Sequence, residues 1–515
     1  MGTAEANPAD RPAWWESRWL AAALIVLAAV PLLYPPIPPL VDMFGHMGRY
    51  RVELDLAASP WLQVYYGYHW AAIGNLGVDL LVKLLGPLIG LEPAVKLIVV
   101  LIPPLTVAGF LWVAREVHGR IPPTAFFAVP FALGHPFMYG FVNFALSVAL
   151  AFLAFGLWLH LGRAGRLKLR AALFVPISLI VFFAHTFGWG MLGLLCFSAE
   201  AVRQHDHQRG WFRSGLNAAL LASVMALPLV IIILWRNEAH GGQTSDWWAW
   251  QFKWRWLKMV LRDRWQAFDI ASACVAGVVL AGAVAVRQLT FSRNLLFTAL
   301  VLLLCFLILP KTVFGSTYAD MRLLPYVIVT ALLAIRFRGV GDRRFAQGLA
   351  IAGLAFCVVR LGGNTLSLAI AADDQRAKLA ALEHVPVGAR VISLAGYACG
   401  EAWTLPRNTH LGGMAIVRRD GFSNDQWTIE GANLLTLKYA RAGAFRSDPS
   451  QIVRDNNCGP RNDWTIDRAL AEVGNSRRRF DYLWLIDPGA YDPRLVAGMQ
   501  PVWRGPGSIL YRLNP

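Results

Sequence analysis

The chain has 515 residues, of which 56% are hydrophobic and only 16% are charged, and its mean hydropathy is +0.45. Because soluble domains carry about 25% charged residues, this composition excludes a soluble enzyme, a disordered protein and a disulfide scaffold. Residues 1–372 hold +13 of the net charge of +16. No nucleic-acid recognition motif accompanies this charge, so it indicates membrane topology and anionic headgroups, not nucleic-acid binding.

Long apolar runs predict a polytopic α-helical membrane protein. We expect about eleven spans, near residues 19–34, 95–113, 121–139, 141–161, 171–186, 187–202, 214–235, 269–286, 294–310, 323–338 and 344–362. Short links rich in Lys and Arg, such as Arg163–Arg170, mark the cytoplasmic side, whereas links 134–140 and 184–190 carry neither residue. The links alternate correctly if the N-terminus is cytoplasmic and the C-terminal part is extracytoplasmic.

Residues 75–92 could form a twelfth span, but counting them would invert the topology of every later link. Asp79 and Lys83 lie four positions apart on one helical face, with leucines opposite. This pattern is typical of a helix at the membrane surface. We expect the segment to lie on the outer leaflet or to dip into it.

Residues 373–515 have a different character from the transmembrane domain, 1–372. Strand-like runs at 390–394, 482–486 and 508–512 alternate with helical stretches at about 374–384 and 464–475. Such alternation predicts a small α/β domain. Cys399 and Cys458 lie in this domain and could form a disulfide in an oxidising compartment, although two cysteines do not require one.

The first external loop, residues 35–93, carries the best candidate for acid–base chemistry. Asp42, His46 and Arg49 follow one another at spacings of four and three, which places them on one face of a helix. A carboxylate there can accept a proton from an attacking hydroxyl, while cationic groups stabilise an anionic leaving group. The alternative is an interfacial helix whose charges face headgroup water.

These residues, in the pattern PxxxDxxxHxxR from Pro38 to Arg49, resemble the first loop of bacterial type C (GT-C) glycosyltransferases. The layout of residues 1–362 is also similar to that family, and the terminal domain more loosely so. The resemblance implies transfer of a sugar from a polyprenyl-phosphate donor to an extracytoplasmic lipid, polysaccharide or protein. It further implies a location in the bacterial cytoplasmic membrane and assigns the role of general base to Asp42.

Some family members carry an adjacent acidic pair at this point, which is associated with divalent-metal coordination. This chain has one acidic residue there, so we expect no cofactor and do not favour a metal. Glu53 and Asp55 lie about three helical turns further on and could contribute only if the loop folds back.

A lipid-phosphate donor needs cations and hydrogen-bond donors near the membrane boundary. Arg322 could bind a phosphate through two hydrogen bonds, or it could instead pair with Asp320 or with headgroups. Lys311 is a second candidate, although a lysine beside a span often serves only as an anchor. His185 and His69 could bind a sugar or phosphate, as could His135, although lone histidines are more often structural.

Two further segments admit more than one interpretation. The tryptophan-rich loop 236–268 predicts a membrane-interface anchor, or a flap over the entry for a lipid chain. The run 410–425 could face a cavity or form a surface loop, and we assign no catalysis to it. Alternatives to a glycosyltransferase are a transporter or flippase of a lipid-linked or anionic substrate, and a non-catalytic partner subunit with the same architecture.

Overall fold

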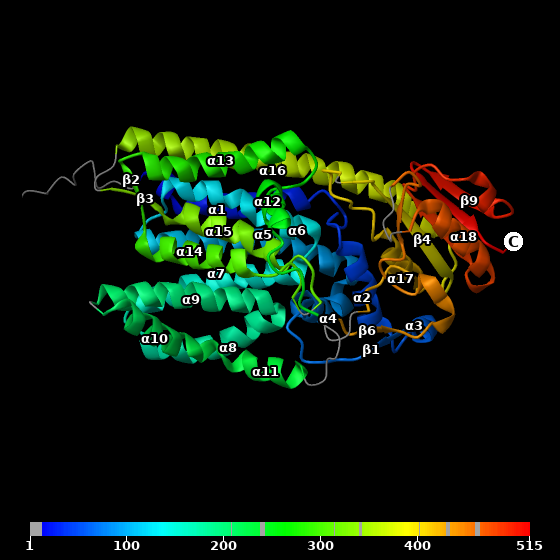
Figure 1. The fold of residues 1–515 in the computed structure, drawn as a ribbon, viewed down its shortest axis with the longest axis horizontal. Helices are drawn as coiled ribbons and strands as arrows, with labels where there is room; N and C mark the ends of the chain where they lie inside the picture. Colours follow the sequence, from blue (N-terminus) through cyan, green and yellow to red (C-terminus); the bar gives the residue numbers. More distant parts are fainter. Residues whose placement is uncertain are drawn as a thin grey trace, which may run out of the picture.

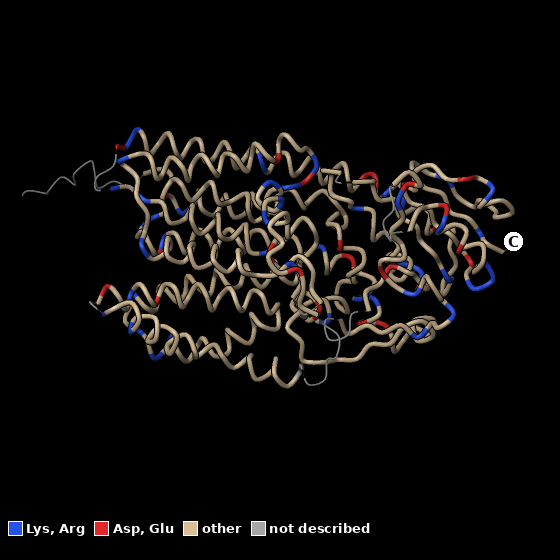
Figure 2. The backbone as a smooth tube through the Cα atoms, viewed as in Figure 1, with Lys and Arg blue, Asp and Glu red and all other residues tan. Residues whose placement is uncertain are grey.

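A helical bundle and a C-terminal domain with a β-sheet lie end to end along the long axis of the molecule (Figure 1). The structure is a computed structural model that describes residues 13–207, 209–236, 243–313, 315–338, 342–400, 402–428, 433–458 and 464–514. Within the bundle, charged residues gather at the end away from the C-terminal domain and around the junction with that domain (Figure 2). Long uncharged stretches of helix lie between them, as expected for a protein that crosses a membrane.

The bundle is built from helices of very different lengths. Its helices are α1 (Arg18–Leu27), α2 (Met43–Asp55), α3 (Pro60–Tyr65), α4 (Gly77–Ile89), α5 (Leu91–His118), α6 (His135–Tyr139), α7 (Val142–Arg163), α8 (Leu167–Ala184), α9 (Thr186–Asp206), α10 (Trp211–Ala222), α11 (Leu227–Arg236), α12 (Trp250–Met259), α13 (Gln266–Ala285), α14 (Arg293–Ile308), α15 (Ala319–Ala334) and α16 (Arg343–Leu379). The strands β2 (Leu289–Phe291) and β3 (Ile335–Phe337) pair antiparallel and connect the start of α14 to the end of α15.

Within the described residues, five helices are long and apolar enough to cross a membrane: α5, α7, α8, α13 and α16. The pair α10–α11, bent by 64°, would make a sixth. The expected count of about eleven is therefore not confirmed. Part of the difference is physical: the run 121–139 forms a buried 3₁₀ helix, η4 (Pro123–Leu133), followed by α6, because its prolines interrupt α-helical hydrogen bonding.

The segment 75–92 contains α4, which at about 20 Å is too short to span the membrane. Leu80, Leu84 and Leu88 are exposed on one side of α4, as expected for a helix at the membrane surface. The polar face of α4, however, does not lie in headgroup water as the sequence predicts. The Asp79 carboxylate is only 1% exposed and pairs with Arg49 inside the protein, so it does not face headgroup water.

The C-terminal domain has one mixed sheet, with strands in the order β5–β4–β8–β10–β9 and with β7 also paired to β4. Its strands are β4 (Arg390–Tyr397), β5 (Phe422–Ser423), β7 (Ile452–Arg454), β8 (Tyr482–Ile486), β9 (Gln500–Gly505) and β10 (Ser508–Arg512), and its helices are α17 (Met414–Arg419) and α18 (Ile466–Ser476). The three expected strand runs form β4, β8 and β10, which confirms the α/β prediction. The expected domain boundary, after residue 372, falls inside the continuous helix α16.

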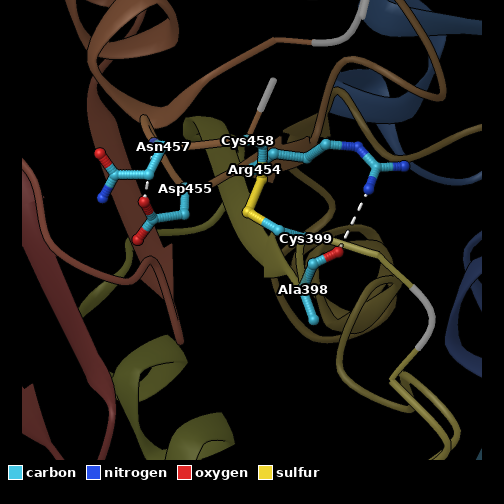
Figure 3. Close-up of a disulfide and its surroundings, with 6 residues drawn as sticks. All are labelled: Ala398, Cys399, Arg454, Asp455, Asn457 and Cys458. Carbon is cyan, nitrogen blue, oxygen red and sulfur yellow. Dashed lines mark hydrogen bonds between the residues drawn. A yellow bond between two sulfur atoms is a disulfide. The ribbon is translucent and has the colours of Figure 1, made fainter. Parts of the chain in front are cut away.

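A disulfide joins Cys399 to Cys458, with their Cα atoms 5.3 Å apart (Figure 3). The neighbouring Arg454 guanidinium donates a hydrogen bond to the Ala398 carbonyl, over 3.2 Å. The pairing that the sequence allowed is therefore formed, and it links the end of β4 to the segment that follows β7.

The first loop is anchored to the C-terminal domain at two places. Its strand β1 (Tyr66–Tyr68) pairs antiparallel with β6 (Leu435–Leu437). One face of α2 packs closely on the same domain, because Gly45 and Gly48 present no side chain there. A Cβ atom would lie 2.5 Å from the Trp427 ring at Gly45, and 2.4 Å from the Gln426 amide at Gly48. Helix α2 is therefore held between the bundle and the C-terminal domain.

Candidate active site

A cavity of about 580 Å³ lies where α2, the bundle and the C-terminal domain meet; we call it the junction cavity. Five of the seven residues predicted for the site line it: Asp42, His46, Arg49, His185 and Arg322. The helical spacing of the first three was therefore a correct guide to their shared face. The C-terminal domain contributes His410, Trp427, Asp448 and Ile452, among others, so both parts of the molecule form the walls.

Asp42 lies at the N-cap of α2, and its carboxylate is nearly buried, with 9% of the residue exposed. Its backbone N–H donates a hydrogen bond of 3.0 Å to the Tyr139 carbonyl. Gly140 adopts a φ of +103°, and a Cβ there would lie 2.7 Å from the Asp42 nitrogen, so this turn needs glycine. Burial raises the pKa of Asp42 to about 7, although the nearby His410 acts in the opposite direction.

His410 is the most important site residue that the sequence analysis left without a role. Its Nε2 lies 3.7 Å from Asp42 Oδ1, and its Nδ1 lies 2.6 Å from Asp425 Oδ1. Burial alone would lower the pKa of this imidazole, but the Asp425 carboxylate more than compensates, and the pKa rises to about 9. Within the run 410–425, His410 thus lines the cavity and Asp425 is buried behind it, so the surface-loop interpretation is wrong for these two side chains.

Arg322 lies in the first turn of α15, at the other side of the cavity, and is 6% exposed. Its guanidinium contacts His185 Nε2 at 3.3 Å, donates to the Thr317 carbonyl at 3.3 Å and lies over the Phe141 ring. In the described part of the chain, no carboxylate forms an ion pair with it. The alternative that Arg322 pairs with Asp320 is wrong, because Asp320 binds Lys253 and the Trp256 indole.

The two other α2 residues have environments unlike that of Asp42. Arg49 Nε lies 2.9 Å from Asp79, and the Asn143 amide also donates to that carboxylate. The charge of Arg49 is therefore already balanced. Burial, reinforced by Arg49, holds the pKa of His46 well below its ordinary value, so this imidazole is neutral. Its ring lies against Trp427, with centroids 5.1 Å apart.

The structure does not bring the remaining candidates into the junction cavity. Lys311 lies over the Phe252 ring, with 4.1 Å between its Nζ and the ring centroid, and His69 is exposed. His135 is buried against Tyr139 and Trp256. Glu53 and Asp55 continue α2 beyond the cavity, without the fold-back that would bring them near Asp42.

An apolar groove of about 460 Å³ adjoins the junction cavity. The two share the lining residues Asn75, Phe144, His185, Ser316 and Arg322. The rest of the groove is mainly hydrophobic, with Met191, Leu194, Ile232 and Leu309 among its walls. Arg322 and His185 therefore stand where a polar space meets an apolar one.

His410, Asp425 and Asp448 are close enough for their ligand atoms to lie within 4.8 Å of one another, a spacing that a metal ion could bridge. The arrangement present is nevertheless a hydrogen-bonded one. The 2.6 Å between His410 and Asp425 is a hydrogen-bond distance, and the Gln451 amide donates to Asp448 over 2.6 Å. These side chains therefore satisfy one another.

No family model and no curated protein matches the chain. Two crystal structures of ArnT from Cupriavidus metallidurans, one in the apo state and one bound to undecaprenyl phosphate, are similar in fold. They are 13% and 12% identical in sequence, each with a TM-score of 0.49, and each similarity covers 96% of this chain and 97% of the other.

Proposed function

We propose that the protein is a type C membrane glycosyltransferase that transfers a sugar from a polyprenyl-phosphate donor to an extracytoplasmic acceptor. One observation carries this proposal: Arg322, a buried guanidinium with no carboxylate partner in the described chain, lies where the cavity holding Asp42 meets an apolar groove. A polyprenyl-phosphate sugar has the same three parts in the same order: an apolar chain, an anion and a polar glycan.

The donor would be bound with its isoprenoid chain in the groove and its phosphate against Arg322 and His185. A guanidinium can form two parallel hydrogen bonds to a phosphate, which suits it to this position. The junction cavity, at about 580 Å³, falls within the usual size range of small-molecule sites and would take the sugar and the acceptor hydroxyl.

In the proposed reaction, the acceptor oxygen forms a bond to the anomeric carbon, and the bond from that carbon to the phosphate oxygen breaks. The electron pair of the broken bond leaves with the polyprenyl phosphate, whose charge Arg322 stabilises. The hydroxyl proton passes to the Asp42 carboxylate. Attack opposite the leaving group inverts the anomeric configuration.

We also propose that this reaction needs no metal cofactor, since a cationic side chain of the protein stands ready for the leaving group. Added EDTA should then leave the transfer rate unchanged. Loss of activity on chelation, restored by a divalent cation, would overturn this part of the proposal and direct attention to His410, Asp425 and Asp448.

The proposed location is the bacterial cytoplasmic membrane, with the N-terminus inside and the C-terminal domain outside. The Cys399–Cys458 disulfide supports this orientation, because disulfides persist in oxidising compartments. Labelling of a cysteine introduced at Asn514 in intact cells, with a reagent that cannot cross the membrane, tests it. Labelling only after lysis would place the domain inside.

The decisive test of function is transfer in liposomes from a labelled pool of polyprenyl-phosphate sugars. We expect transfer by the wild type and by Asp55→Asn, a control on the same helix outside the cavity, and loss of transfer in Asp42→Asn. Equal transfer by Asp42→Asn would remove the proposed base. Movement of the donor across the bilayer without any transfer would instead identify a transporter.

A further inference from the structure

The carboxylate of Asp42 faces a cationic side chain from the other end of the sequence. His410 precedes the 3₁₀ turn η7 (Leu411–Gly413) of the C-terminal domain, yet its Nε2 lies 3.7 Å from Asp42 Oδ1. Both residues are buried, His410 with only 5% of its surface exposed. At this distance and burial, water screens the interaction between the two charges weakly.

A hydrogen bond on the side of the ring away from Asp42 fixes the orientation of His410. Asp425 accepts a hydrogen bond from the imidazole Nδ1–H over 2.6 Å, and its second oxygen accepts one from the Gly413 N–H over 3.0 Å. This contact directs Nε2 toward Asp42. The Trp427 ring covers the imidazole, with centroids 4.7 Å apart, so the ring has little freedom to turn away.

We propose that His410 is a positioning residue for the reaction: held by Asp425, it presents a positive charge to Asp42 and favours the ionised form of that carboxylate. Ionised Asp42 can accept the proton of the acceptor hydroxyl, whereas protonated Asp42 cannot. The catalytic part of this inference rests on the proposed function, but the charge pairing itself does not.

The other groups around Asp42 divide into two sets. Burial, Asp448 and Asp425 oppose its ionisation, whereas His410 and Arg322 favour it. The remaining titratable groups facing this pair are neutral His46 and the phenols of Tyr139 and Tyr318. Among the described residues, His410 is the only basic side chain within ion-pair distance of Asp42. An opposite charge at such a distance typically lowers a carboxyl pKa by about 1 to 3 units.

This inference gives the C-terminal domain a part in the chemistry. The domain would supply the counter-charge for a base that belongs to the first loop of the bundle. The close packing of Gly45 and Gly48 of α2 on that domain sets the distance between the two. Changes at this contact should therefore alter the ionisation of Asp42 without touching its side chain.

Infrared spectroscopy of the full-length protein in detergent tests the pairing without any substrate. The carbonyl stretch of protonated Asp42, identified by its absence in Asp42→Asn, is followed as a function of pH. We expect the midpoint of this titration to lie about 1 to 2 pH units higher in His410→Gln than in the wild type. An unchanged or lowered midpoint in a folded variant would overturn the proposal.

Further variants separate charge from structure. Asp425→Asn should raise the Asp42 midpoint in the same direction, because the imidazole then loses the carboxylate that keeps it protonated. The loss of this positive charge outweighs the removal of the Asp425 charge, whose direct effect on Asp42 is smaller than that of His410. His410→Lys should restore part of the wild-type midpoint by restoring the charge. His384→Gln, which replaces an exposed histidine, should leave it unchanged. Gel filtration and the thermal unfolding midpoint identify variants that fail to fold.

The pH profile of transfer then distinguishes failure of the ion pair from failure of the proposed function. If both are right, the acid limb of kcat/KM moves upward in His410→Gln by the same amount as the infrared midpoint. If the infrared midpoint moves but the wild type transfers no sugar, the pairing stands and the proposed function fails. If transfer occurs and neither quantity moves, His410 has no such role.

Discussion

Two groups of buried charges in this protein are arranged in opposite ways. The first lies where α13, α16 and residues 403–407 meet. There Asp269 pairs with Arg360 at 2.5 Å and accepts from the Trp403 indole at 2.7 Å. In the same group Asp263 pairs with Arg407 at 2.6 Å. Every one of these charges has an opposite charge at hydrogen-bond distance.

The second group lines the junction cavity and is incompletely paired. Arg322 contacts an imidazole, a carbonyl and aromatic rings, and the nearest cation to Asp42 is 3.7 Å away. Buried charges are costly unless they are matched. A fully matched group therefore belongs to the fold, whereas an incompletely matched one marks a place where a charged ligand completes the pairing.

The largest effect that this comparison predicts is at Asp42. Asp42→Asn should reduce transfer about 10²- to 10⁴-fold, the usual contribution of a positioned base, with little change in the unfolding midpoint. In the wild type, burial raises the pKa of Asp42 to about 7. Because the base acts when ionised, transfer should rise with pH through neutrality. A flat rate between about pH 5.5 and 8.5 in liposome assays would contradict this assignment.

The fully paired group predicts a loss of stability. Arg360→Met leaves the Asp269 carboxylate buried without its cation, which should lower the free energy of unfolding by about 3 to 5 kcal/mol. Thermal unfolding in detergent measures this effect, and Val359→Ala, at an exposed neighbouring position, is the control. The double variant Arg360→Met, Asp269→Asn should recover part of the loss. A loss below about 1 kcal/mol would remove the distinction between the groups.

Local patterns in the sequence were sufficient to predict the residues on one side of the cavity. Asp42, His46 and Arg49 share a face because helical spacing alone decides it. Apolar runs identified a helical membrane protein, and alternating runs identified the strands β4, β8 and β10. The number of membrane spans was harder to predict, because a proline-rich apolar run and a bilayer span have similar composition.

The other side of the cavity depends on contacts between distant parts of the chain. His410 meets Asp42 only because α2 packs on the C-terminal domain through Gly45 and Gly48. No spacing rule connects positions 42, 410 and 425. Asp79 is a similar case: its helix was predicted correctly, but its buried partner Arg49 lies in another element. Residue types indicated which groups are reactive, and the tertiary structure decides which of them meet.

Substitution of Arg322 should have a smaller effect, on the rate of transfer and not on stability. Arg322→Gln should weaken transfer by about 10- to 100-fold, since a hydrogen bond to a charged group contributes about 1.5 to 3 kcal/mol. Stability should be nearly unchanged, because the variant leaves no carboxylate without its partner. Initial rates over a range of donor concentrations measure this effect, with Arg336→Gln, at an exposed arginine of β3, as the control. Loss of folding in Arg322→Gln would instead place Arg322 with the structural charges.

The smallest effect should be at Lys311, the cation that the structure leaves outside the cavity. Its ammonium lies over the Phe252 ring at 4.1 Å, an interaction usually worth about 0.5 to 1 kcal/mol at an exposed or half-buried site. Lys311→Gln should therefore change transfer less than about threefold and lower stability only slightly. If donor turnover instead falls tenfold or more in Lys311→Gln, the donor phosphate is bound further along the 311–322 link than Arg322. Because Arg322 lies over the Phe141 ring at the same distance, only its position in the junction cavity distinguishes it from Lys311, and that position would then be a poor guide to which cation binds the donor.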